Sequence, residues 1–418
     1  MNVKKKDLLL YAALCTGILV MFLVLIAAAK IVKIVREAQG REGPGSYYQM
    51  LKVIPEGKSL EVLDIKKSWY KVKFENVEVW ISENSITMEN EKESAKKDVF
   101  ESFSFDTVSP TASPAVLTAA IKGFWTRFSK IQSKDLVELP VDGFDIPVKY
   151  YESFADERSR AVVRDNLFKK YGLPSSYKKP RISYEQEHSV GYSCASSIAD
   201  APLVEDEDLI RYIHSVGWYI AEATERYDIH YIYYILDTDR INAVSCPGGY
   251  IVLTRGLLEL LHDESELAAL LAHEMSHVIA GHGMTQVIED NIRIKADTAF
   301  DALAKETKPA SEAEEDLIAI TNRAISIATS PKLDEYEFEA DKMAMRYLAR
   351  SGYDLNGHIR LLNTLMAKHE ANIDIFDLNY RNHPDFKERL KRSENELRSY
   401  RDYKGFQFTE AFRKNMTF

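Results

Sequence analysis

Cysteine is scarce in this chain of 418 residues, which contains only Cys15, Cys194 and Cys246. Three cysteines exclude a disulfide framework, and none belongs to a Cys-x-x-Cys pair that binds zinc. We interpret Cys194 and Cys246 as two buried thiols. A disulfide between them is the alternative if this part of the chain is exported.

Basic residues are also fewer than acidic ones: the chain has 54 lysines and arginines and 64 aspartates and glutamates, which gives a formal net charge of -10. Without a broad basic surface to neutralise phosphates, the chain is not expected to bind nucleic acid. Hydrophobic residues make up 45% and charged residues 28%, which excludes a mainly disordered or fibrous protein. The length is sufficient for one large domain and a smaller module.

One long uncharged run lies near the N-terminus. Residues 8–29 carry no charge, and as a helix they are long enough to cross a hydrocarbon core of about 30 Å. We expect an uncleaved transmembrane anchor; a cleavable signal peptide is the alternative, because three lysines precede the run. Basic residues flank it on both sides, so the positive-inside rule leaves its orientation open.

Short strands separated by turns are predicted for residues 47–88. The expected strands are Met50–Ile54, Leu60–Leu63, Trp69–Phe74 and Val77–Ile81. The order VIPEGKSLEVLDIKKSWYKVKF followed by VEVWISENSI resembles the bacterial SH3 domain. The resemblance implies a small β-barrel that binds a cell-wall or protein ligand, and a plain spacer is the alternative.

The middle of the chain is predicted to be a linker followed by helices. Residues 89–115 are charged and then rich in Ser, Thr and Pro, as linkers are. Residues 116–180 are expected to be a connecting helical region, because apolar residues near its start recur at about the 3.6-residue period. Residues 181–400 are expected to form the large domain.

The large domain combines helices with a small sheet in this interpretation. A helix is predicted at Glu205–Tyr227, because its apolar residues line one face. Strands are predicted at Tyr231–Leu236 and Tyr250–Thr254, joined by a turn-rich segment that ends in Pro247-Gly248-Gly249. Both strands precede the segment that carries the chemistry.

A candidate zinc motif lies on the next predicted helix, whose start is marked by the capping-box pattern of Asp263 and Glu266. The helix carries His-Glu-Met-Ser-His at 273–277. Because residues four apart share a helical face, His273 and His277 can direct imidazole nitrogens at one Zn²⁺. Glu274 is then the candidate general base that acts on the zinc-bound water.

A catalytic zinc site takes three protein ligands, so a third ligand is required. Glu337, in a helix predicted over 333–350, is the candidate, and Asp341 lies one turn further on the same face. Asp341 can accept the free N–H of a ligand histidine. Glu339 projects from another side of the helix and is the less favoured ligand. His282 is interpreted as a helix-end residue, and an approach to the metal is the alternative.

Four sequence blocks together resemble the zinc metallopeptidases related to the CAAX prenyl protease and the HtpX heat-shock protease, in particular their Oma-type branch. The blocks are NAVSCPGGYIVLTRGLL, ESELAALLAHEMSHVIAGHG, YEFEADKMAM and NHPDFKERL. The similarity runs from about residue 183 to 393, half of the chain.

The resemblance implies roles for individual residues. His273, His277 and Glu337 would bind one zinc ion, and Asp341 and Arg389 would support them. His383 would lie near the metal, either as a latch in the open zinc position or as a donor to the oxyanion; a loop histidine without metal contact is the alternative. An extended peptide would add to an edge strand in the PGG block. The residues expected to border this peptide are Asn242, Gly249 and Tyr250.

The sequence therefore predicts an α+β protein, in which a transmembrane helix and an SH3-like β-barrel precede a mainly helical zincin domain of the gluzincin type with a small β-sheet. Its expected function is that of a membrane-anchored zinc endopeptidase, on the periplasmic side, that cleaves misfolded or membrane-associated proteins. The alternative is a non-catalytic zinc-containing chaperone or scaffold that binds proteins through the SH3-like module.

Overall fold

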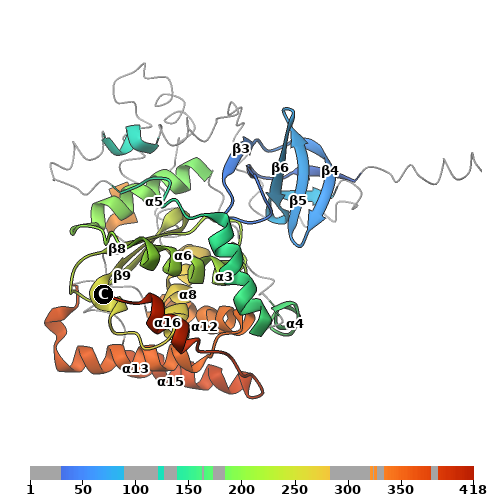
Figure 1. The fold of residues 1–418 in the computed structure, drawn as a ribbon. Coiled ribbons are helices and arrows are strands. Elements are labelled where there is room, and N and C mark those ends of the chain that lie inside the picture. The colour runs from blue at the N-terminus through green and yellow to red at the C-terminus, as the bar shows by residue number, and fades with distance from the viewer. Residues whose placement is uncertain are drawn as a thin grey trace, which may run out of the picture. The chain divides into compact units, whose positions relative to one another are not determined.

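The computed structural model describes residues 30–88, 121–126, 139–161, 164–172, 184–282, 321–322, 324–326, 334–377 and 385–418 (Figure 1). The predicted membrane segment 8–29 and linker 89–115 lie outside these ranges. Among the residues that the structure describes, no helix combines the length and hydrophobicity needed to cross a bilayer.

The chain divides into two compact units. The first comprises residues up to 44 and 50–111, and the second comprises 45–49 and 112–418. Each unit has its own hydrophobic core of buried aliphatic and aromatic side chains.

The first unit is a seven-stranded antiparallel sheet with the strand order β3-β2-β6-β5-β4-β1-β7. Its strands are β1 (Ile31–Ile34), β2 (Ala38–Arg41), β3 (Met50–Ile54), β4 (Ser59–Lys66), β5 (Trp69–Phe74), β6 (Val77–Ser82) and β7 (Ile86–Met88). The turn η1 (Glu83–Ser85) precedes β7. The predicted strands 50–54 and 69–74 have the bounds of β3 and β5, whereas β1, β2 and β7 were not predicted.

Local residue choice explains the central hairpin of this sheet. Glu75 and Asn76 connect β5 to β6, and both have positive φ, at 46° and 65°. Two left-handed residues give the tight turn whose twist suits a two-residue hairpin, and asparagine accepts this conformation more readily than most residues. On the strands, Val72, Val79 and Ile81 point into the core and are fully buried.

The second unit is mainly helical. Its elements before the candidate zinc motif are α3 (Val148–Ala161), α4 (Arg164–Lys170), α5 (Tyr184–Ile198), α6 (Glu207–Ala221), β8 (Ile232–Leu236), β9 (Ala243–Cys246), η2 (Pro247–Gly249), β10 (Tyr250–Thr254) and α7 (Arg255–Leu258). The elements from the motif onward are α8 (Glu264–Ala280), α12 (Asp334–Ser351), α13 (Asn356–Ala371), η3 (Ile373–Ile375), α15 (Phe386–Leu397), η4 (Arg398–Tyr400) and α16 (Thr409–Asn415).

The sheet of the second unit has three strands in the order β8-β10-β9. β10 lies in the centre, parallel to β8 and antiparallel to β9, with Ile251 opposite Ser245. The segment before Pro247 was predicted to be turn-rich, and this was wrong for Ala243–Cys246, which pairs with β10. The helix predicted over Glu205–Tyr227 is likewise longer than the observed helix, since α6 runs from Glu207 to Ala221.

Helix α8 is the centre of this unit, and every residue from Glu264 to Ile279 is buried. It packs against α6, α12, α13 and β9. Asp263 caps its first turn by accepting the backbone N–H of Glu266, as the capping pattern predicted. Gly281 ends the helix in the left-handed conformation, with φ of 70°.

Candidate active site

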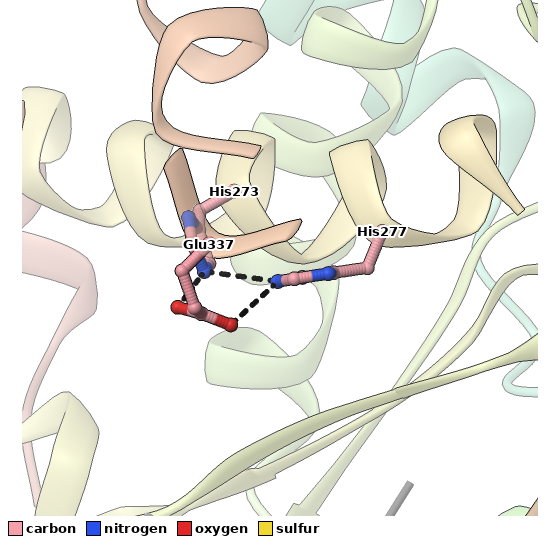
Figure 2. A group of neighbouring side chains, drawn as sticks. All are labelled: His273, His277 and Glu337. Carbon is pink, nitrogen blue, oxygen red and sulfur yellow. Dashed lines mark hydrogen bonds and ion pairs between the residues drawn. The ribbon is translucent and has the colours of Figure 1, made fainter. Parts of the chain in front are cut away.

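The His-Glu-Met-Ser-His motif lies on α8, and Glu337 reaches it from the first turn of α12. His273, His277 and Glu337 are all buried, and their side chains point toward one another (Figure 2). Each offers one ligand atom, and these atoms lie within 4.8 Å of one another. The structure thus brings together the three residues that the sequence analysis selected as metal ligands.

The spacing of these atoms can be compared with a metal site. His273 Nε2 lies 3.2 Å from His277 Nε2 and 3.4 Å from Glu337 Oε2, and His277 Nε2 lies 3.2 Å from Glu337 Oε1. Ligands bound tetrahedrally to Zn²⁺ at about 2.0–2.2 Å lie roughly 3.3 Å apart. Two imidazoles and one carboxylate are also a typical catalytic zinc donor set. The three residues therefore fit Zn²⁺.

The other nitrogen of His273 faces Asp341, which lies one turn beyond Glu337 on α12. Nδ1 of His273 is 2.9 Å from Asp341 Oδ1, so an Nδ1–H donates to the carboxylate and leaves Nε2 facing Glu337. Arg389 on α15 donates from Nε to Asp341 Oδ2 at 2.9 Å and from Nη2 to Oδ1 at 2.7 Å. Its Nη1 lies 2.8 Å from Glu337 Oε2. Arg389 thus binds the carboxylates of both Asp341 and Glu337.

The charges of this cluster are strongly coupled. Burial works against the charged imidazole of His273, but attraction to Glu337 and Asp341 outweighs it and raises its pKa to about 9. Burial would raise the pKa of Asp341, but Arg389, with hydrogen bonds from His273 and His358, holds this pKa well below its usual value. Glu337 and Asp341 therefore favour positive charge beside them.

His277 has a second partner of a different kind. Its Nδ1 lies 2.8 Å from His282 Nδ1, and His282 Nε2 lies 3.3 Å from Glu339 Oε2. The His282 ring stacks on Tyr336, with centroids 4.2 Å apart. If His277 presents Nε2 to a metal, its Nδ1–H donates to His282, whose own Nε2–H donates to Glu339.

Comparison with known proteins agrees with this arrangement. Residues 207–397 match the family model described as Peptidase family M48, and residues 41–87 match the bacterial SH3 domain. We call the part of the chain that matches Peptidase family M48 the M48 domain. Its resemblance to this zinc metallopeptidase family and to the bacterial SH3 domain, predicted from the sequence, is confirmed.

Relatives of the M48 domain carry a common name. The beta-barrel assembly-enhancing protease of Escherichia coli (strain K12) is 29% identical over 176 residues, which cover 41% of this chain and 36% of that protein. The protein of the same name from Yersinia pestis is 28% identical over the same shares. A putative one from Vibrio cholerae is 29% identical over 158 residues, 37% of this chain and 32% of that protein. The matched region spans about a third of these relatives.

The residues expected to border a substrate lie at opposite ends of the M48 domain's sheet, Asn242 at one end and Gly249 and Tyr250 at the other. Asn242 directly precedes β9; its backbone N–H donates to Thr254 Oγ1 and its side chain donates to Asp377. Gly249 has φ of 90° at the turn into β10. Tyr250 begins the central strand and is buried. Asn242 thus directly precedes the edge strand, and Tyr250 pairs with its last residue, Cys246.

Glu274 and His383 complete the predicted catalytic set. Glu274 is buried on α8 beside His273. His383 lies outside the described residues, so neither of its expected roles is tested. Glu339 is mostly exposed and contacts His282 rather than the ligand cluster.

Sequence reasoning missed two histidines of the M48 domain. His282 was interpreted as a helix-end residue, yet the left-handed Gly281 turns the chain so that His282 contacts His277. His358 on α13 is buried, with Nε2 3.4 Å from Asp341 Oδ1. The pattern His-x-x-x-His-x-x-x-x-His contains His282, but a contact five residues away depends on the turn. Nothing in the local sequence marks His358.

Proposed function

We propose that this protein is a zinc-dependent endopeptidase. The observation that carries the proposal is the separation of 3.2–3.4 Å among the ligand atoms of His273, His277 and Glu337, with Glu274 adjacent on α8. This separation is that of a tetrahedral zinc site with one position left for water or substrate.

In this proposal His273, His277 and Glu337 hold one Zn²⁺ per chain. Zinc, when bound, supplies Lewis-acid chemistry, which polarises a peptide carbonyl and acidifies water. Glu274 takes the proton from the attacking water and later gives it to the leaving amine. Asp341 fixes the orientation and tautomer of His273, and Arg389 keeps Asp341 ionised and pairs with Glu337.

The substrate class we propose is misfolded or membrane-associated polypeptides. Two observations support it. The relatives are named as proteases that enhance β-barrel assembly, and β9 is an edge strand of the sheet, next to which an extended peptide can add through main-chain hydrogen bonds. Asn242 then borders the peptide, with Gly249 and Tyr250 shaping the turn behind it.

The remaining parts of the proposal rest on the sequence. We propose that residues 8–29 anchor the chain in a membrane, with the M48 domain on the periplasmic side, and that the SH3 domain binds a cell-wall or protein ligand. His383 is proposed to act near the metal as a latch or as an oxyanion donor.

The test combines metal content with proteolysis. The full-length chain is purified in detergent, its zinc is quantified by mass spectrometry, and its cleavage of casein is compared with that of Glu274→Gln. We expect about one zinc per chain in both proteins and casein cleavage lowered at least about 100-fold in the variant, because a general base contributes 10²–10⁴-fold. Glu335→Gln, an exposed residue of α12, is the matched control and should cleave normally.

Two results would contradict the proposal. Full activity of Glu274→Gln would exclude its role as general base. Zinc at full occupancy with no casein cleavage by the wild-type chain would instead favour the zinc-containing chaperone or scaffold.

A further inference from the structure

Helix α5 presents one face to the segment that carries the edge strand. Glu187 Oε1 accepts the backbone N–H of Gly248 at 3.4 Å, and the same carboxylate binds Arg226. One residue later, His188 Nδ1 lies 3.0 Å from the hydroxyl of Tyr250. The start of α5 is therefore tied to both η2 and β10.

The same face continues one and two turns further along α5. A Cβ on Gly191 would lie 1.8 Å from the carbonyl oxygen of Pro247, so only glycine allows this approach. Cys194 follows three residues later, and its Sγ lies 2.8 Å from Sγ of Cys246. The close approach at Gly191 brings the two cysteines into contact.

The surroundings of the two thiols exclude other uses. A structural or catalytic zinc needs at least three protein ligands. Within the described part of the chain, the group that meets this condition is His273, His277 and Glu337, not the thiols. Both cysteines are also almost fully buried. Thiols that exchange with substrates are at least partly exposed, so a redox-catalytic pair is excluded.

We propose that Cys194 and Cys246 form a disulfide that fastens α5 to β9 when the chain folds in an oxidising compartment. The two sulfurs of a disulfide are about 2.0 Å apart. The Sγ–Sγ distance of 2.8 Å must therefore shorten by less than about 1 Å for the bond to form. The two thiols lose two protons and two electrons as one S–S bond forms. The electrons reduce a disulfide oxidant such as oxidised glutathione, whose S–S bond breaks to give two thiols.

The position of this bond indicates what it would stabilise. Cys246 is the last residue of β9, the edge strand to which the proposed function adds a peptide, and it directly precedes η2. The cysteines are 52 residues apart, and the loop between them contains α6 and β8. Closing a long loop restricts the unfolded chain, so the bond stabilises this half of the domain.

The primary test is the thiol content of the full-length chain carrying Cys15→Ser, in which Cys194 and Cys246 are the remaining cysteines. The protein is refolded in a glutathione redox buffer and then denatured in the presence of iodoacetamide, which alkylates free thiols. Its mass is measured by mass spectrometry. We expect no alkyl group before reduction and two after it. In the control Cys194→Ala, Cys246 should be alkylated or carry glutathione. Two alkyl groups on the unreduced wild-type pair would overturn the proposal.

A second measurement separates the bond from simple packing of the thiols. Strong reductant should lower the Tm of the cross-linked protein, on the order of 5–10 °C, and should leave that of Cys194→Ala/Cys246→Ala unchanged. A Tm that is insensitive to reductant in both proteins would show that the pair does not fasten α5 to β9. Neither measurement depends on peptidase activity, so the proposed function can fail while this proposal stands.

Discussion

Each candidate zinc ligand of the M48 domain has a partner behind it. His273 donates to Asp341, and His277 contacts His282. Such partners fix the orientation of each ring, so that Nε2 of both histidines faces Glu337. The orientation of the site is therefore set before a metal binds.

Glu337 and Glu339 offer a direct comparison of a ligand with a residue two positions away. We expect Glu337→Ala to abolish stoichiometric zinc binding, because two ligands remain and Arg389 loses one of its two carboxylate partners. Glu339→Ala should lower zinc affinity less than about tenfold, since in the described part of the chain Glu339 contacts His282 rather than a candidate ligand. Zinc titration in a competing chelator measures both, and equal losses would show that the ligand assignment is wrong.

His282 is expected to support zinc binding without touching the metal. His282→Ala should lower zinc affinity roughly 10–100-fold, the usual effect of losing a partner of a ligand histidine. In His282→Asn, the amide oxygen takes the place of Nδ1 and accepts from His277 Nδ1–H, so much of the affinity should return. If both variants bind zinc as the wild type does, the contact between His277 and His282 has no role in the site.

The elements that the sequence predicted best are those with a strong local pattern. The strand over 69–74 alternates, and the helix over 333–350 differs from α12 by one residue at each end. β9 was missed because Ala243–Cys246 is short and has one β-branched residue, so its pairing with β10 decides its structure. The candidate metal ligands were predictable from their sequence pattern, whereas His358 reaches Asp341 only through the packing of α13.

Helix α6 joins the sheet through His214, which is fully buried. Its Nδ1–H donates to the carbonyl of Ile210 at 2.8 Å, and its Nε2 accepts the backbone N–H of Tyr233 in β8 at 3.1 Å. Both bonds require the neutral ring, because a proton on Nε2 would face the N–H of Tyr233. Burial is the main cause that lowers the pKa of His214 to about 3.

This pKa predicts a loss of stability in mild acid. The unfolded chain binds a proton at His214 near pH 6.5, and the folded chain does not until about pH 3. Above pH 6.5 the protonation of His214 does not lower the free energy of unfolding. Below that pH the unfolded chain is favoured, and the free energy of unfolding falls by about 2 kcal/mol at pH 5. Urea unfolding at pH 7.5 and pH 5 should show a smaller acid loss for His214→Gln. An equal loss in both proteins would exclude His214 as the cause.

At the scale of the whole molecule, α8 is held at both ends by buried polar groups. Glu264, in its first turn, accepts hydrogen bonds from Arg158 of α3, Tyr212 of α6 and Tyr353. Its last turns carry the candidate ligands. Because the Glu264 contacts involve no metal, we expect the M48 domain to stay folded after metal removal. It should lose only the part of its free energy of unfolding that metal binding supplies.

Because the two units have separate hydrophobic cores, we expect a chelator to change the thermal unfolding of only one of them in the full-length chain. Calorimetry should show two transitions. Metal bound at 100 times its Kd stabilises by about 2.7 kcal/mol, so chelation should lower the Tm of the M48 domain by about 5–10 °C and leave that of the SH3 domain unchanged. Val79→Ala, in the core of the SH3 domain, identifies its transition, because only that one should move.

The matched control is Glu337→Ala, which should unfold at the same temperature with and without chelator. A chelator shift that persists in Glu337→Ala would place the stabilising metal elsewhere. A shift of the SH3 transition in the wild-type chain would show that the two units unfold together, because metal binding at α8 and α12 stabilises the first unit only if the two transitions are coupled.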